Sequence, residues 1–293
     1  MFHASSARMI VLMKALSFFG GLVLPLFVLS ASAQVSADLT LDQEQFLPGE
    51  SVPVHVHVTN HSGQTLHLGD DQSWLSFIVE AEDGSVVIRK SEPPVVGAFD
   101  LPSSDVAIKR VDLAPYFMLS HPGRYKVTAT VHIKGWNMDV TSPPQKFDVI
   151  QGAELWSQVF GVPNSSASNT PPVVRKYTLL EANYLQSELR LYLQVTDISA
   201  GSVVKVSPIG PMISFGQPEA ELDPASNLHI LYQNGASTFS YTVINPDGNV
   251  TQQEFYDYVS VRPRLRQDDS GNISVYGGVR RVETPPVKPP DQL

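Results

Sequence analysis

The chain has 293 residues, with 20 basic and 29 acidic side chains, a formal net charge of −9 and no cysteine. An acidic chain without a basic run disfavours nucleic acid and anionic membrane surfaces as partners. The lack of cysteine excludes disulfides, a thiol nucleophile and thiolate metal sites.

Residues 1–33 have the parts of a secretory signal peptide. Arg8 and Lys14 supply a positively charged start, and residues 15–29 form an apolar core. Residues 31–33, Ala-Ser-Ala, give the small-x-small pattern that signal peptidase requires, so we expect cleavage directly after them. The true start is Met1, Met9 or Met13.

The alternative to cleavage is an uncleaved membrane anchor. The apolar core is shorter than the roughly 20 residues that span a bilayer. We therefore expect no membrane span after signal cleavage, and a periplasmic or extracellular protein. A secreted chain of this size without cysteine is typical of bacterial exported proteins.

Residues 34–150 show short alternating strands separated by turn residues, a pattern that predicts a β-sandwich. The run VPVHVHVTN (52–60) alternates most clearly, with valines on one face and Pro53, His55 and His57 on the other. The run 74–89 predicts a hairpin with its turn at Glu82-Asp83-Gly84.

Several motifs follow one another in this region. They are a "PGE" turn (48–50), a valine-alternating strand ending in "TNHSG", a strand–"DG"–strand hairpin and a "PGRYKVTATV" strand. This order resembles the immunoglobulin-like sandwiches of bacterial surface proteins, and more particularly the BsuPI-type proteinase-inhibitor domain, over residues 38–150. The resemblance implies an immunoglobulin-like fold and inhibition through exposed loops, for which the candidates are residues 60–64, 92–102 and 136–141.

Residues 151–176 are expected to form a linker with one possible strand. The strand candidate is ELWSQVF (154–160), which the sequence assigns to neither neighbouring domain. Residues 161–173 have the Ser/Asn/Pro composition of an exposed loop.

Residues 177–282 contain an internal repeat, because segments 217–235 and 262–278 align with a spacing of about 45 residues. The matched pairs are Pro218 with Pro263, Asp223 with Asp268, and Asn227 with Asn272. This period predicts a second antiparallel β domain with propeller-like repeats. The alternative is a plain meander in which similar turns recur, and the domain is too short for a closed ring of blades unless other chains complete it.

The tail, residues 283–293, is rich in proline. Because proline lacks a backbone donor, we expect an extended, polyproline-like peptide rather than a strand.

His55 and His57 are the candidate metal ligands, since residues i and i+2 of a strand point to the same side. A metal site needs three or four converging ligands, and the nearby His61 is expected in a turn. We therefore predict no metal and no cofactor, and interpret both histidines as part of the wet face of the strand.

No nucleophile elbow, zinc-protease motif or phosphate-binding glycine loop occurs in the sequence. Glu219, Glu221 and Asp223 alternate along one predicted strand and are the candidates for a carboxylate-based hydrolase. The sequence favours a non-catalytic protein over this alternative.

The candidate binding residues are aromatic or lie near predicted loops. Tyr256 and Tyr258 are expected on the face opposite Phe255, where they either contact a partner or pack within the sheet. Asn60, His61 and Trp136 lie at the predicted sandwich loops.

We expect an exported non-catalytic binding or scaffolding protein of the bacterial envelope, with a protein or glycan of the cell envelope as its partner. The alternatives are a proteinase inhibitor acting through sandwich loops and a glycan-active hydrolase on a propeller-like domain.

Overall fold

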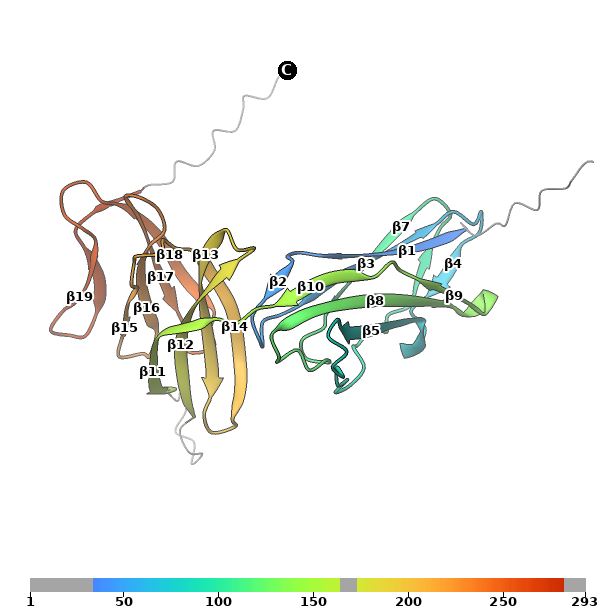
Figure 1. The fold of residues 1–293 in the computed structure, drawn as a ribbon, viewed down its shortest axis with the longest axis horizontal. Helices are drawn as coiled ribbons and strands as arrows, with labels where there is room; N and C mark the ends of the chain where they lie inside the picture. Colours follow the sequence, from blue (N-terminus) through green and yellow to red (C-terminus); the bar gives the residue numbers. More distant parts are fainter. Residues whose placement is uncertain (1–33, 164–172, 282–293) are drawn as a thin grey trace, which may run out of the picture. The chain divides into compact units, whose positions relative to one another are not determined.

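The computed structural model describes residues 34–163 and 173–281 (Figure 1). The expected signal peptide, the choice of start codon and the proline-rich tail lie outside these residues. Apart from the short 3-10 turns η1 (Gln72–Trp74) and η2 (Lys134–Trp136), the regular secondary structure of the described part is β-strand. The all-β class is therefore confirmed. Within those ranges, no helix has the length and apolar character needed to cross a membrane.

The N-terminal sandwich, residues 34–150, is built from two main sheets. The first is antiparallel and has the order β1 (Val35–Leu41), β3 (Pro53–Asn60), β7 (Val106–Asp112). The second has the order β2 (Gln45–Phe46), β10 (Gln145–Val149), β8 (Gly123–Ile133), β5 (Leu75–Ala81), with β9 (Met138–Thr141) also paired to β8. In this second sheet β2 pairs with β10 in parallel.

The core of this sandwich follows from the alternation of its strands. Val54 and Val56 of β3 are fully buried and pack in one cluster with Phe77 of β5 and Val127 of β8. Each such side chain contributes about 1.5–3 kcal/mol by leaving water. The predicted inward valines and outward histidines of residues 52–60 are confirmed.

The expected hairpin at 74–89 is wrong in its second half. Its turn forms, with Gly84 at a φ of +80°, but β5 pairs with β8 and not with the residues that follow the turn. β8 buries every second side chain along its length, whereas Val86 and Ile88 are exposed. Pairing with β8 therefore gives β5 more apolar burial than pairing with the residues after the turn would.

A small pair of strands, β4 (Leu66–Leu68) and β6 (Phe99–Leu101), joins the same core. The chain reaches β6 through a crossing in which the Gly97 amide donates to the Gly69 carbonyl at 3.0 Å. This crossing forms part of the wall of the candidate site described below.

The C-terminal part, residues 151–281, begins with a four-stranded antiparallel sheet. Its order is β11 (Ala153–Gly161), β12 (Val174–Tyr184), β13 (Glu188–Asp197), β14 (Ser202–Pro211). The strand expected within residues 151–176 is β11, and its pairing with β12 places it in this sheet.

A second antiparallel sheet follows. Its order is β15 (Glu219–Leu222), β16 (Leu228–Gln233), β17 (Thr238–Ile244), β18 (Val250–Asp257), β21 (Val279–Arg280). Leu228 and Ile230 of this sheet share a buried cluster with Leu179 and Leu193 of the preceding one, so the two sheets face each other. A separate hairpin, β19 (Arg264–Gln267) with β20 (Ile273–Tyr276), contributes Leu265 and Val275 to a smaller cluster on β16 and β17.

The repeat detected in the sequence corresponds to two hairpin turns of the same geometry. The Asp223 amide donates to the Asn227 carbonyl at 3.1 Å, and the Asp268 amide donates to the Asn272 carbonyl at 2.9 Å. These turns join β15 to β16 and β19 to β20, which lie in different sheets. The propeller-like relation stays a prediction.

Candidate functional site

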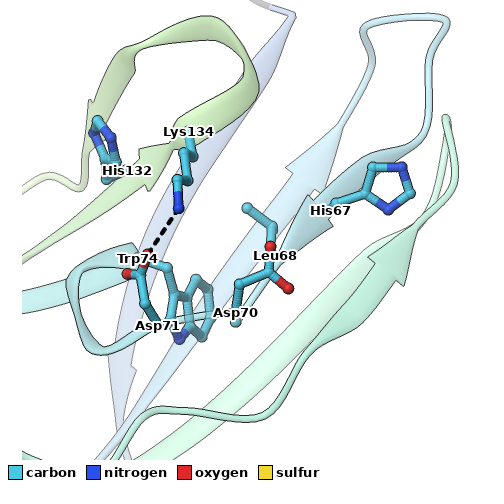
Figure 2. A pocket seen from close by; sticks show the side chains of 8 residues that line it. His67, Leu68, Asp70, Asp71, Trp74, His132 and Lys134 are labelled. Atoms are coloured by element: carbon cyan, nitrogen blue, oxygen red, sulfur yellow. Dashed lines mark hydrogen bonds and ion pairs between the residues drawn. The ribbon is translucent and has the colours of Figure 1, made fainter.

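Two hollows of the N-terminal sandwich are candidates for a binding site. The first lies beside η1 and η2, as Figure 2 shows, and its polar lining residues are His67, Asp70, Asp71, His132 and Lys134. Its volume is about 10 Å³, which is room for about one water molecule. Lys134 Nζ lies 3.4 Å from Asp71 Oδ2 across it. The first hollow is therefore too small for a ligand.

The second hollow is a cavity of about 160 Å³, which we call the β7 cavity. Its lining comes from η1, the crossing before β6, β6 itself, β3 and β7, and consists of Val58, Trp74, Gly97, Phe99, Ala107, Ile108 and Lys109. A cavity of about 150 Å³ is large enough for a benzene-sized group. The β7 cavity is therefore the larger of the two and predominantly apolar.

Trp74 and Phe99 form the aromatic wall of the β7 cavity. Their rings meet edge to face with centroids 5.6 Å apart. Trp74 is buried, and its Nε1–H donates to the Val95 carbonyl at 2.9 Å. Because both the ring and its polar atom are fixed, this wall is formed before any ligand arrives.

The turn that carries Trp74 is fixed by Asp71. The Asp71 carboxylate accepts the Ser73 amide at 2.9 Å at the start of η1. Hydrogen bonds from the Ser73 hydroxyl and amide hold the pKa of Asp71 below its ordinary value. Asp71 therefore stays ionised, and keeps this cap, at neutral pH.

The opposite wall is β7, whose Ala107, Ile108 and Lys109 all line the cavity. Ala107 pairs with Val58 and Lys109 pairs with Val56, so their side chains share the face of those buried valines. Ala107 is small and leaves space between β7 and the aromatic wall.

Lys109 is the one charged residue in the lining of the β7 cavity. Other lysines of this sandwich form ion pairs, Lys126 with Glu80 at 3.2 Å and Lys146 with Glu82 at 2.6 Å. Lys109 has no such partner among residues 34–163 and 173–281. The site therefore presents apolar walls and one cation, which suits an apolar group with a neighbouring negative charge.

Comparisons with known proteins add little to this geometry. No family model matches the chain, and no curated protein matches it. Among solved structures, it is similar to a sporulation control protein from Bacillus subtilis, with 14% identity and a TM-score of 0.31, over 58% of this chain and 82% of that one. A similarity at that TM-score carries no argument about fold or function.

The two candidate metal ligands contact different partners. His55 Nε2 lies 3.0 Å from Asp42 Oδ1, and His57 Nε2 lies 3.2 Å from Thr40 Oγ1. In the described ranges, no group of three or more His, Cys, Asp or Glu side chains could hold a metal ion.

The candidate binding residues of the N-terminal sandwich lie in unlike environments. Asn60 is fully buried, and its amide donates to the carbonyls of Gln64 at 2.7 Å and Leu101 at 2.9 Å. His61 is exposed in the following turn, and Trp136 is partly buried against the core. Asn60 therefore holds the loop in place, and none of these three residues lines either of the two hollows.

Tyr256 and Tyr258 also differ from each other. The Tyr256 hydroxyl donates to Glu254 Oε2 at 2.7 Å, and the ring packs on the β16–β17 cluster. Burial, followed by the hydrogen bond to Glu254, raises the pKa of the Tyr256 phenol above its ordinary value. Tyr258 lies beyond the end of β18 and is 48% exposed.

Two of the three carboxylates proposed for a hydrolase, Glu219 and Asp223, have partners within the fold, whereas Glu221 forms no side-chain hydrogen bond or ion pair with a described residue. Glu219 accepts Arg264 Nη1 at 2.7 Å and the Leu265 amide at 2.8 Å. Asp223 accepts the Asn227 amide at 2.8 Å. These contacts attach the β19–β20 hairpin to β15 and close the β15–β16 turn.

Of the residues that line the β7 cavity, Gly97 and Phe99 fall within the candidate loop 92–102, and the others are not among those predicted from the sequence. The sequence pattern places Trp74 at the start of a strand and predicts no role for Lys109. One signal for Lys109 can be found in the segment VAIKRVD. Lys109 lies two residues before Val111 and so on the same face of a strand, and Val111 is buried.

Proposed function

We propose that this chain is an exported, non-catalytic binding protein of the bacterial envelope, and that it holds its partner at the β7 cavity. The observation that carries the proposal is a preformed aromatic wall, Trp74 and Phe99, facing a lysine without an ion pair to any described residue. Export is supported by the signal-peptide pattern of residues 1–33.

A cavity of this kind contributes to binding in two ways. Filling it buries apolar surface at about 25 cal/mol per Å², and its fixed walls lose little conformational entropy when a partner binds. The Lys109 ammonium adds selectivity for a negatively charged neighbour, because a like charge placed there is repelled.

The test compares capture of envelope components by wild-type protein and by Ala107→Trp, which fills the cavity. Ser36→Trp is the matched control, because Ser36 is exposed on the outer face of β1 in the same sheet. We expect a component that wild type and Ser36→Trp retain and that Ala107→Trp loses, with unchanged circular dichroism. Equal retention by all three proteins would contradict binding at the cavity.

Proteinase inhibition is the second candidate, and one observation favours it beyond the resemblance to BsuPI-type domains. Val96 is 57% exposed between Val95, which is buried, and Gly97, while Trp74 holds the Val95 carbonyl. A rigidly held exposed residue is what an inhibitor loop presents to a protease. Inhibition of a protease panel that weakens in Val96→Glu but persists in Ala107→Trp would favour this function over cavity binding.

A further inference from the structure

β7 is an edge strand whose outer side is open. In the described part of the chain it pairs with β3 alone, at the end of the order β1-β3-β7. The other edges are occupied to a greater degree. β1 lies against β8 and β9, and on β5 the Phe77 carbonyl accepts Arg89 Nη2 at 2.6 Å.

The pairing with β3 determines which backbone groups of β7 face outward. The Asn60 amide donates to the Asp105 carbonyl, and the Leu113 amide donates to the Val52 carbonyl. Hydrogen-bonded pairs alternate in an antiparallel ladder. Residues 105 and 113 bond to β3, so every second residue between them, 107, 109 and 111, also turns its N–H and C=O groups toward β3. The N–H and C=O groups of residues 106, 108 and 110 point away from β3.

Both faces of β7 are suited to a neighbouring strand. On the outer face, Val106 is 53% exposed and Ile108 is 61% exposed, an unusual amount of apolar surface for an unprotected edge. On the inner face, Ala107 and Lys109 border the β7 cavity. A strand added along β7 would therefore direct every second side chain toward Trp74 and Phe99.

We propose that the partner is an extended protein segment that adds to β7 as a further strand, with a large apolar side chain in the β7 cavity and an acidic side chain two residues away beside Lys109. This inference rests on the proposed function and names its partner. Strand addition uses backbone hydrogen bonds for affinity and pockets for side-chain selectivity.

Charge favours an acidic segment over a second copy of this chain. Lys109 has no ion pair with a described residue, so two β7 strands side by side would place two unpaired ammonium groups on the same face, whereas Arg110 is already paired with Asp42 at 3.4 Å. A protein segment is also favoured over a glycan, because the outward N–H and C=O groups recur at every second residue, which is the repeat of a β-strand.

The probe is a synthetic peptide of about nine residues with phenylalanine between two glutamates on one face and threonines on the other. Glutamate on both sides lets either strand direction present a carboxylate to Lys109. Binding is followed by the fluorescence of Trp74 in the Trp136→Phe, Trp156→Phe protein. A peptide with lysines in place of the glutamates should bind at least about fivefold more weakly, and Lys109→Glu should reverse this preference.

Backbone pairing is tested with two N-methylated peptides, one methylated on each alternate set of amides. Only one set faces β7, so one peptide should lose at least about tenfold in affinity and the other should retain it. Equal binding of both peptides, or no peptide binding, would overturn strand addition.

The outcomes separate this inference from the proposed function. Suppose that Ala107→Trp loses an envelope component that wild type retains. If that component is a glycan, or if it is a protein but the peptides do not bind, the binding function stands and the strand inference is overturned. If wild type is a dimer that Lys109→Ala strengthens, a second copy occupies β7 and the inference is again overturned. If neither the peptides nor any envelope component depends on the cavity, both proposals fall.

Discussion

Asp223 and Asp268 occupy the same position in two turns, but in different surroundings. Each carboxylate accepts the amide and the side-chain nitrogen of an asparagine four residues later, at 2.8 and 2.8 Å for Asp223 and at 2.8 and 3.0 Å for Asp268. Asp223 has a further contact, with His229 Nε2 at 3.4 Å, and His229 Nδ1 lies 2.7 Å from the Tyr241 hydroxyl. The first turn is therefore tied to the buried sheet, whereas the Asp268 carboxylate accepts hydrogen bonds only from described residues of its own turn.

We expect Asp223→Ala to lower the free energy of unfolding by about 2 kcal/mol, because it removes hydrogen bonds to an ionised, partly buried group. Asp268→Ala is the matched control. It removes the same turn contacts at an exposed site and should have a smaller effect. Urea denaturation of both variants measures the difference, and equal losses would contradict a special role for the Asp223–His229 contact.

The effect of Asp223→Ala should also depend on pH. Burial opposes ionisation of Asp223, but hydrogen bonds from Asn227 and His229 outweigh it, so its folded pKa lies below the ordinary value of 3.8. A depressed folded pKa stabilises the protein above the unfolded pKa, and this stabilisation is lost as the pH falls through the folded pKa. The gap between wild type and Asp223→Ala should be full near pH 6 and shrink below about pH 4; a constant gap down to about pH 3 would contradict this sign.

At the scale of elements, the β7 cavity depends on the crossing between β4 and β6. Gly69 has a φ of +85°, and a Cβ built there would lie 2.1 Å from the Gly97 carbonyl oxygen. Only glycine allows this close approach. The crossing in turn places Gly97 and Phe99 in the cavity lining.

Gly69→Ala should therefore destabilise the sandwich and disturb the cavity. Gly63→Ala is the matched control, since Gly63 has a φ of +78° and a Cβ added there would meet nothing within 4 Å. Both variants bear the left-handed backbone cost of about 1 kcal/mol, and Gly69→Ala adds the clash with backbone. We expect a larger loss of stability and a shifted Trp74 fluorescence maximum in Gly69→Ala alone. The same loss in both variants would show that the clash is relieved without cost.

The sequence predicted strands well where one face is buried and the other is wet. Residues 52–60 are the clearest case, because four alternate valines fix the register of β3. Prediction failed where tertiary pairing overrides the local pattern, as in the hairpin after β5. In β7, pairing with β3 likewise turns Ala107, Lys109 and Val111 inward and leaves Val106 and Ile108 exposed.

Only one part of the candidate site was predicted from the sequence, the loop 92–102 that contains Gly97 and Phe99, and the rest was missed for the same reason. Its walls come from separate stretches of the chain: Trp74, the crossing before β6, and β7. None of these stretches carries a binding motif, and the small size of Ala107 matters only because an aromatic pair faces it. The residues singled out from the sequence were chosen by residue type and by their place near predicted loops. Several of them, such as Asn60 and Tyr256, have polar atoms that form hydrogen bonds within the fold.

At the scale of the whole molecule, we assign recognition to one edge of the N-terminal sandwich. The C-terminal sheets have their own buried cluster, centred on residues such as Leu193 and Leu228. Their acidic candidates Glu219 and Asp223 hold turns and hairpins in place. Substitutions that weaken those contacts should lower the free energy of unfolding more than they change the affinity of binding at β7.

The most direct test is an amide NMR titration of the purified protein with the glutamate–phenylalanine peptide. We predict that the Trp74 indole N–H and the outward amides of Val106, Ile108 and Arg110 shift together, while the amides of Ala107 and Lys109, which already bond to β3, shift much less. Shifts spread evenly along β7, or confined to the C-terminal sheets, would contradict the assignment of the binding site.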